Sequence, residues 1–262
     1  MRRVGVGYRA ELADWIQSQS SGMDCLEITA EHFFGADHKL LNRLAEQFEL
    51  YVHGLGLSLG TPGPLDKKIL KQFAKVADAA NAKWISEHVA FTKTSEVDLG
   101  HLNPVPSTRE FLEILVEHAQ ELADFCKRPL IMENITFDLK MHGELGEPDF
   151  LNQLCDKANC GLLLDVTNLF INSKNHRFSA MEWLREIQPS YIRQLHIVGY
   201  SLADGSYRDH HGAKIQPDLL DLLGAVLDYA PVEAVILERD ARLHEFDEIA
   251  DEISTLQRVA TA

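Results

Sequence analysis

The stretch P-L-I-M-E-N-I-T-F, Pro129 to Phe137, joins a short apolar run to a carboxylate and an amide. Such a run is typical of a strand that is buried in a parallel sheet. Glu133 and Asn134 follow the run directly, and a buried charged side chain costs free energy unless a partner compensates it. In a barrel of parallel strands, active sites lie at this end of the strands. A single carboxylate there could equally cap the next helix or pair with a lysine, so the other strand ends decide the matter.

Strands and helical segments alternate along the whole chain. The predicted strands span residues 4–8, 25–29, 50–55, 84–91, 129–137, 161–166, 192–198 and 232–237. The predicted helices span residues 10–19, 38–48, 65–80, 107–125, 148–158, 179–187, 217–229 and 244–259. This order predicts an α/β fold, a single (β/α)₈ TIM-barrel domain over residues 1–262. An open doubly wound sheet is the alternative, but no glycine-rich dinucleotide fingerprint follows the first strand.

Three connections are expected to be irregular loops. They are residues 98–106, the polar segment between residues 166 and 179, and the segment from the seventh strand through Gly212. Ser107, with Glu110 three residues later, predicts a capping box at the start of the helix that runs through Phe125.

The composition excludes several classes of partner. The formal charge of −15 argues against a nucleic acid, because binding to a phosphate backbone needs clustered lysine and arginine. The four cysteines show neither C-x-x-C pairing nor zinc-finger spacing, which predicts mostly buried free thiols in a reducing compartment. The chain begins without an apolar signal region, and no segment is long enough to span a bilayer. We therefore expect a cytoplasmic protein that binds neither nucleic acid nor a membrane.

Side chains that can bind a metal stand at the ends of most predicted strands. In strand order they are Glu27 and Glu31, His53, Glu87 and His88, Glu133 and Asn134, Asp165 and Asn168, His196, and Glu238. The loop after the seventh strand adds D-H-H-G, Asp209 to Gly212. Each residue alone is more simply explained as a hydrogen-bonded core residue, a helix cap or a surface group.

Together these residues are harder to explain without cations. Closure of the barrel brings the strand ends to one mouth, where several histidines and carboxylates would repel one another or lack partners. Zinc takes four ligands and an octahedral ion six, so the set exceeds one ion and predicts two or three ions bridged by carboxylates. Imidazole and carboxylate without thiolate suit iron, zinc or manganese, and the ligand types do not choose between them.

The ordered set of motifs resembles one family over nearly the whole chain. The motifs are L-E-I-T-A-E (26–31), H-G (53–54), S-E-H-V-A-F (86–91), N-P-V-P-S-T (103–108), M-E-N (132–134), L-D-V-T-N (164–168), L-H-I-V-G (195–199), D-H-H-G (209–212) and L-E-R-D (237–240). The family is DUF692, the multinuclear non-haem iron-dependent oxidative enzymes, which include the biosynthetic enzymes for methanobactin and 3-thiaglutamate. Each motif is weak alone, whereas the ordered set is specific.

The resemblance implies a (β/α)₈ barrel with two or three iron ions of mixed Fe(II)/Fe(III) valence and O₂ as co-substrate. The implied ligands are His53 and His88 for one iron, Asp165, His196 and Glu238 for a second, Glu133 as the bridge, and Asp209, His211 and Asn168 for a weaker third. The implied substrate-binding residues are Arg9, Glu31 and Asn134. Two positions depart from the family pattern: His32 replaces an expected asparagine, and D-H-H-G replaces D-T-H-G, which leaves His210 without a role.

The implied reaction is an oxidative modification of a cysteine in a ribosomally synthesised precursor or carrier peptide. The compact chain favours excision of the β-carbon at a C-terminal cysteine over formation of an oxazolone and thioamide. A barrel with few insertions offers little surface for a long peptide, so we expect a separate peptide-recognition partner protein in a heterodimer. The rival is a metal-dependent hydrolase or isomerase of the endonuclease IV or xylose isomerase kind. A non-enzymatic metal-binding scaffold is disfavoured, because so much buried charge is costly without a function.

Overall fold

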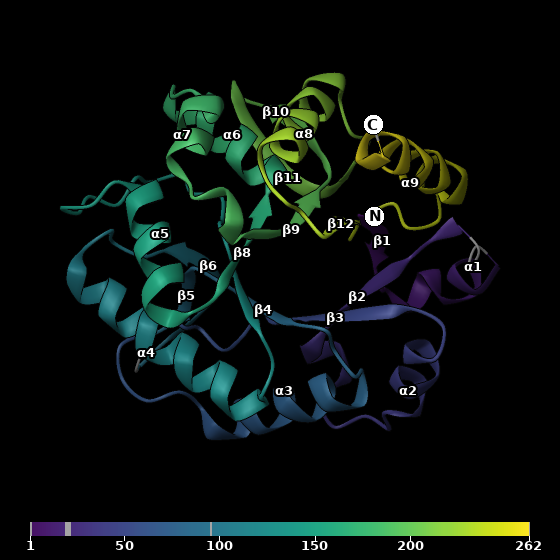
Figure 1. Ribbon diagram of the computed structural model, residues 1–262, viewed down its shortest axis with the longest axis horizontal. Helices are drawn as coiled ribbons and strands as arrows, with labels where there is room; N and C mark the ends of the chain where they lie inside the picture. Colours follow the sequence, from purple (N-terminus) through teal and green to yellow (C-terminus); the bar gives the residue numbers. More distant parts are fainter. Residues whose placement is uncertain (1, 19–21, 95, 262) are drawn as a thin grey trace.

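The structure is a computed structural model that describes residues 2–18, 22–94 and 96–261. Eight parallel strands close into a barrel in the order β1-β12-β9-β8-β7-β4-β3-β2. The connecting helices lie outside this barrel (Figure 1). The predicted α/β fold and TIM barrel are confirmed.

The barrel strands are short and almost completely buried. They are β1 (Arg3–Gly7), β2 (Cys25–Thr29), β3 (Glu49–His53), β4 (Ile85–His88), β7 (Leu130–Glu133), β8 (Gly161–Asp165), β9 (Ile192–Ile197) and β12 (Ala234–Leu237). Four of them, β3, β4, β7 and β8, end on His53, His88, Glu133 and Asp165. The strand predicted for residues 129–137 therefore ends earlier than expected, at Glu133 itself.

The helices present an apolar face to the barrel. They are α1 (Ala13–Ser18), α2 (Lys39–Ala45), α3 (Lys67–Ala79), α4 (Arg109–Cys126), α5 (Glu147–Ala158), α6 (Val166–His176), α7 (Ala180–Glu186), α8 (Pro217–Tyr229) and α9 (Phe246–Thr261). In α3, for example, the Asp66 side chain caps the first turn, and Leu70, Phe73 and Val76 are buried at helical spacing. The predicted end of the first helix at Gln19 lies outside the described residues.

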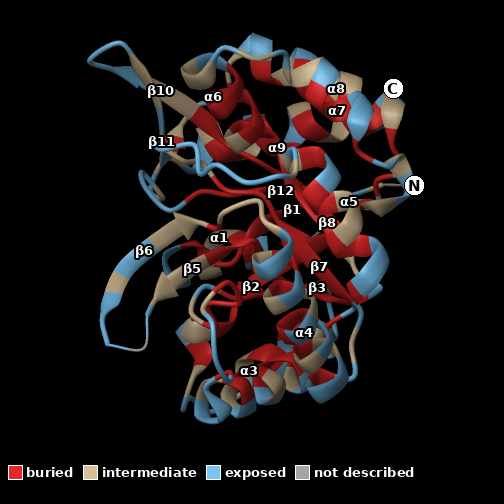
Figure 2. Cartoon of the chain, turned by 90° about the vertical axis from the view of Figure 1, so that its left-hand side faces the viewer, coloured by how far each residue is buried: buried red, intermediate tan, exposed pale blue. Residues whose placement is uncertain are grey.

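Two β-hairpins replace predicted loops at the mouth of the barrel. β5 (Ala90–Lys93) pairs antiparallel with β6 (Asp98–Pro104), so the prediction of an irregular segment at 98–106 was wrong. β10 (Gly199–Ala203) pairs with β11 (Ser206–Ala213), which corrects the loop predicted through Gly212. Figure 2 shows both hairpins projecting from the same side of the barrel.

Two local predictions at helix starts were also wrong. α6 begins directly after β8, where Asp165 accepts a hydrogen bond from the Asn168 amide, so no long polar loop separates them. Packing outweighs the weak helix propensity of this polar segment, because α6 buries Leu169 and Phe170. At α4 the N-cap is Thr108, whose hydroxyl accepts from the Phe111 amide, rather than the predicted Ser107.

Two further observations concern the cysteines and the apolar character of the helices. Cys25, Cys126 and Cys155 are buried free thiols and Cys160 is a half-buried one, as predicted. Within the described ranges, no helix combines the length and the apolar character that a membrane crossing requires.

Candidate metal centre

Two groups of metal-binding side chains share Glu133 at the mouth of the barrel. The first group is His53, His88 and Glu133, whose ligand atoms all lie within 4.8 Å of one another. Glu133 Oε2 lies 3.3 Å from Nε2 of His53 and 3.4 Å from Nε2 of His88. These three side chains end β3, β4 and β7. The parallel register places His88 beside Glu133, and it places His53 beside Ser86, two residues before His88.

The second group is Glu133, Asp165, His196 and Glu238. His196 Nδ1 lies 3.3 Å from Glu133 Oε1 and 3.2 Å from Glu238 Oε2. Glu133 thus directs one carboxylate oxygen toward each group, which is the geometry of a bridging ligand. All the residues of both groups are buried. We call these two groups the inner centre.

A third group lies further out and is more exposed. His211 Nδ1 lies 3.5 Å from Glu238 Oε2 and 3.7 Å from Asp240 Oδ2. On its other side, His211 Nε2 lies 3.7 Å from Asp209 Oδ2. The side chains of His211 and Asp240 are 34% and 44% exposed. We call His211, Glu238, Asp240 and Asp209 the outer group, although Glu238 also belongs to the inner centre.

The third set of ligands inferred from the sequence differs from this outer group in three residues, because the outer group includes Glu238 and Asp240 and lacks Asn168. Asp240 was missed, although it stands only two residues after Glu238 in L-E-R-D. Asn168 is occupied within the chain: its Nδ2 donates to the carbonyl of Asn134, and its backbone amide donates to Asp165 Oδ1.

Buried polar atoms without a hydrogen-bond partner mark the site independently. The unpartnered atoms among the described residues are His53 Nε2, Glu133 Oε2, Asp165 Oδ2, His196 Nδ1, Asp209 Oδ2, His211 Nδ1 and Glu31 Oε2. A buried polar atom without a partner costs roughly 1–3 kcal/mol. All but the last belong to the inner centre or the outer group, and each has a lone pair that a cation would accept. The residues present therefore fit a multinuclear metal centre.

The charges of the site depend on one another. Burial, reinforced by Glu133, Glu238 and Asp209, raises the pKa of Asp165 well above its ordinary value. Burial and the neighbouring His88 and His196 lower the pKa of His53. Burial would raise the pKa of Glu238, but His196 and His211 outweigh it and lower that pKa well below the usual range. Bound cations would replace the protons that otherwise balance these carboxylates.

Each histidine of the inner centre is held from behind through its other ring nitrogen. His53 Nδ1 lies 2.8 Å from the Ser86 hydroxyl, and His88 Nδ1 lies 3.3 Å from Glu87 Oε2. His196 Nε2 lies 2.7 Å from Glu27 Oε1. Supporting contacts of this kind orient a metal-binding imidazole and strengthen it as a donor. Glu27 and Glu87 drew attention in the sequence as strand-end acids, but nothing there distinguished support from ligation.

The predicted substrate-binding residues already have partners in the chain. Arg9 Nε lies 2.5 Å from Asp240 Oδ1. Glu31 Oε1 accepts from the amides of Leu55 and Gly56, which leaves its other oxygen free. The Asn134 side chain donates to the Asp165 carbonyl and accepts from the Asp165 amide. Asn134 therefore holds β8 beside β7, and its contact with substrate stays a prediction.

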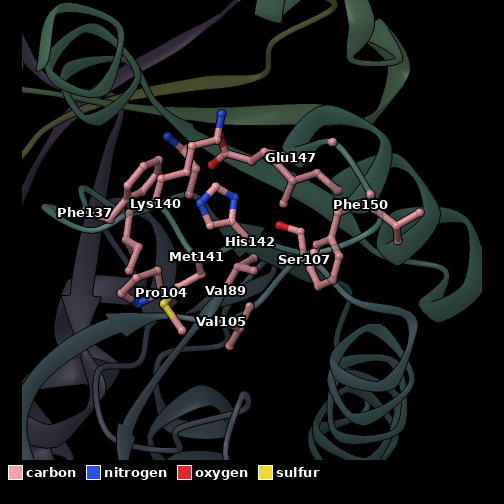
Figure 3. A pocket seen from close by; sticks show the side chains of 16 residues that line it. Val89, Pro104, Val105, Ser107, Phe137, Lys140, Met141, His142, Glu147 and Phe150 are labelled. Carbon is pink, nitrogen blue, oxygen red and sulfur yellow. The ribbon is translucent and has the colours of Figure 1, made fainter. Parts of the chain in front are cut away.

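Two adjoining cavities lie next to residues of the inner centre and the outer group. The first, of about 280 Å³, adjoins it through Val89 and Asn134, the residues that follow His88 and Glu133. Its wall is mostly apolar, with the polar side chains of Ser107, Lys140, His142 and Glu147 among the residues shown in Figure 3. The second, of about 460 Å³, reaches Asp209 and His210 of β11. Both are lined by Pro104, Phe137 and Met141.

Comparisons with known proteins identify the family of the chain and support its fold. The family described as "RiPP precursor modification enzyme MbnB/TglH/ChrH" matches residues 3–261. A UPF0276 protein of Shewanella sediminis is 32% identical over 262 residues, covering 97% of this chain and 93% of the relative. A D-psicose 3-epimerase structure has a TM-score of 0.66 at 16% identity, covering 99% of this chain and 100% of the other. An IOLI protein with a bound zinc atom has a TM-score of 0.65 at 13% identity, covering 99% and 98%. The last two likenesses show the fold alone.

Proposed function

Because the chain belongs to the MbnB/TglH/ChrH family of RiPP precursor modification enzymes, we propose that it oxidatively modifies a cysteine in a ribosomally synthesised peptide, using iron and O₂. The observation that carries the proposal is Glu133, whose two oxygens face two separate groups of unpartnered donors. Such a residue serves to bridge two ions, and a pair of ions is what a multinuclear oxidative enzyme requires.

The proposal assigns two ions to the inner centre and a third to the outer group. His53 and His88 would hold one ion, Asp165, His196 and Glu238 the second, and Glu133 both. Imidazole and carboxylate ligands suit iron, and the carboxylates would balance its charge. Bound iron of mixed valence would pass electrons from the substrate cysteine to O₂ and would provide a Lewis-acidic position for the cysteine thiolate. Asp209, His211 and Asp240 would hold the third ion more weakly, because two of their side chains are partly exposed.

The chain's own residues would position the peptide and keep water away. The apolar side chains of Val89, Val105, Ile135 and Phe150 would displace water from one wall of the first cavity. The second cavity, between β6 and β11, provides the path along which a peptide would arrive. Glu27, Ser86 and Glu87 would hold the three imidazoles, while Asn134 holds β8 in register with β7.

The proposed product is a peptide that has lost the β-carbon of a C-terminal cysteine, with an oxazolone and thioamide as the second possibility. In the first case the carbon would leave at the oxidation level of formate, and one O₂ would take up the four electrons released. The chain has few insertions beyond its two hairpins, so we propose that a separate partner protein recognises the rest of the peptide in a heterodimer. Recognition of the peptide and modification of its cysteine would both take place in a reducing compartment, where the substrate thiol and the four free cysteines stay reduced.

The first test is the identity of the metal. Protein purified without oxygen should contain two to three iron ions per chain, and Mössbauer and EPR spectra should show coupled ions. Incubation with O₂, the partner protein and a cysteine-containing peptide should then change the peptide mass by a defined amount. Zinc at full occupancy, with no iron-dependent change in any candidate peptide, would overturn the proposal and favour a metal-dependent hydrolase or isomerase.

A further inference from the structure

We propose that a buried chain of hydrogen bonds from Trp84 through Gln194 and Glu27 selects which ring nitrogen of His196 binds metal. The inference rests on the metal centre of the proposed function, but on neither its reaction nor its substrate. These three would be positioning residues, because they act on the centre only through the His196 ring.

The chain of contacts is short and completely internal. Trp84 Nε1 donates to Gln194 Oε1 over 2.6 Å, and Gln194 Nε2 donates to Glu27 Oε2. Glu27 Oε1 lies 2.7 Å from His196 Nε2. The four side chains come from β2, β9 and the residue before β4, and each residue is at most 4% exposed. Water therefore does not compete for these hydrogen bonds, and their directions must be mutually consistent.

Those directions follow from Trp84, because an indole N–H can only donate. It requires the Gln194 oxygen to face the indole, so the Gln194 amide group faces Glu27. A carboxylate only accepts, so its second oxygen requires a proton on His196 Nε2. Gln194 Nε2 also lies 3.3 Å from His196 Nε2, but the carboxylate oxygen is closer to that ring nitrogen and takes its proton. His196 Nδ1, which faces Glu133 and Glu238, is consequently the nitrogen that can offer a lone pair to an ion.

This tautomer is the reverse of that of the other two inner histidines. His53 and His88 direct Nε2 toward Glu133 and are held at Nδ1 by Ser86 and Glu87. An isolated neutral imidazole can carry its proton on either ring nitrogen. His196 therefore needs a hydrogen-bond partner that fixes the proton on Nε2. With the opposite tautomer, an N–H would point into the second group of the inner centre, and the ion there would lose a ligand.

The variant Glu27→Gln tests the inference sharply. If the oxygen of the new amide accepts from His196 Nε2, its NH₂ group meets the NH₂ group of Gln194 or forces Gln194 to turn an N–H toward Trp84. All partners are satisfied only if the new amide donates to His196 Nε2, which places the ring proton on Nδ1. We expect the affinity for Zn²⁺ at this group to fall about 10–100-fold, the range typical of a lost supporting contact to a metal-binding imidazole.

A double exchange, Glu27→Gln with Gln194→Glu, supplies the rescue. Trp84 would then donate to the new carboxylate at position 194. The new amide at position 27 would donate to the same carboxylate, and its oxygen would accept from His196 Nε2. Every hydrogen bond is restored, while the negative charge moves from position 27 to position 194. We therefore expect the affinity for Zn²⁺ to recover most of the loss.

The matched control is Tyr51→Phe. Tyr51 stacks on Trp84 with ring centroids 4.3 Å apart, but it donates its hydroxyl to Glu49, outside the chain of contacts. This variant disturbs the same buried layer without touching the hydrogen bonds that lead to His196. Its Zn²⁺ affinity should therefore equal that of the wild type, and a loss as large as that of Glu27→Gln would count against the inference.

The readouts are Zn²⁺ stoichiometry and affinity by competition titration, and long-range ¹H–¹⁵N correlations of the histidine rings in the diamagnetic Zn²⁺-loaded protein. The wild type should show His196 bound through Nδ1 with a proton on Nε2. Binding through Nε2, or wild-type affinity in Glu27→Gln, would overturn the inference. Should Glu27→Gln fail to fold, Trp84→Phe removes only the first donor and should weaken Zn²⁺ binding to a smaller degree; unchanged binding there would count against it. Zn²⁺ binding through Nδ1 in a chain that modifies no peptide would contradict the proposed function alone.

Discussion

The inner centre and the outer group use the same ligand types on different supports. The inner ligands stand at or next to the ends of barrel strands and are buried, and three of them are histidines supported from behind by Ser86, Glu87 and Glu27. The outer group adds His211 at the end of a hairpin and Asp240 in a loop, both partly exposed. His211 also adopts a left-handed backbone conformation, with φ of 48°.

The two sites use the same types of ligand, so we expect them to differ in how firmly they hold an ion because the backbone that carries their ligands differs. Strand ends are held by hydrogen bonds on both sides, so the inner ligands stay close together even though their charges oppose this. Strand β11, which carries His211, pairs with no strand other than β10 in the described part of the chain. Solvent screens the charges of this hairpin. We therefore expect inner ions that are retained and an outer ion that exchanges. The predictions below test this contrast.

The largest expected effect belongs to Glu133→Ala. Glu133 faces both inner groups, so its loss should remove both inner ions and all activity, as measured by metal analysis and peptide mass spectrometry. The variant should unfold at the same temperature as the metal-free wild type or above it, because burial and Glu133 raise the pKa of Asp165, a sign of unfavourable crowding in the empty site.

The control for this substitution is Glu147→Gln. Glu147 is a half-buried carboxylate that accepts from the Trp183 indole and belongs to none of the three groups of metal-binding side chains. It should keep the full complement of metal. Retention of both inner ions by Glu133→Ala would show that Glu133 does not bridge them.

The second effect concerns Arg239, which links the two regions. Its fully buried guanidinium pairs with Glu252 and Glu248 of α9 and donates to the carbonyl of Gly212 at the end of the outer hairpin. Removing one partner of a buried ion pair costs about 3–5 kcal/mol. We expect Arg239→Leu to lower the free energy of unfolding by about this amount in urea titrations. We also expect it to reduce the affinity for the outer ion more than the affinity for the inner ions.

Arg242→Ala is the matched comparison. Arg242 is only three residues away and shares Gly212 and Glu248 with Arg239 as partners. Its side chain is exposed, however, and it also pairs with Glu245 on the surface. Solvent screens an exposed ion pair, so Arg242→Ala should lower the free energy of unfolding far less than Arg239→Leu does. Equal losses of stability in the two arginine variants would show that burial of Arg239 does not set its effect.

The sequence predicted the inner centre better than the outer group for a physical reason. A short apolar run followed by a polar residue predicts a strand and a candidate ligand near its end. β3, β4, β7 and β8 end on His53, His88, Glu133 and Asp165, which the sequence singled out, although the predicted strands ran one to four residues further. Parallel register then places these residues together without further information. The predicted irregular segments failed because hairpin pairing between Asp98–Pro104 and Ala90–Lys93 depends on partners that a single segment does not reveal.

Hydrogen-bond partners behind the ligands could not be predicted in the same way. Gln194 and Ser86 are ordinary polar residues within strands, and only closure of the barrel brings Gln194 to Trp84 and Glu27. Likewise, Asp240 joins the outer group because Arg9, from the opposite end of the chain, holds its side chain near His211. Such contacts depend on three-dimensional neighbours, which neither periodicity nor motif spacing contains.

The third prediction compares two adjacent histidines. His211→Ala should remove the outer ion and leave both inner ions, because His211 contacts Glu238 from outside the inner centre. His210→Ala should keep every ion, since His210 lines the second cavity instead. Metal analysis after brief chelation distinguishes the outcomes. Loss of an inner ion in His211→Ala would mean that the two regions form one cooperative unit.

The smallest expected effect concerns Asp240. Its carboxylate is shared between His211 and Arg9, and it is partly exposed, so Asp240→Asn should weaken the outer ion only about two- to tenfold, below the range for a buried supporting group. Arg9→Gln releases the same carboxylate from its cation and should strengthen the outer ion. The two variants must therefore move metal affinity in opposite directions in the same titration. If both weaken it, the ion pair acts as a structural unit, and the outer ion depends on His211, Glu238 and Asp209 without Asp240.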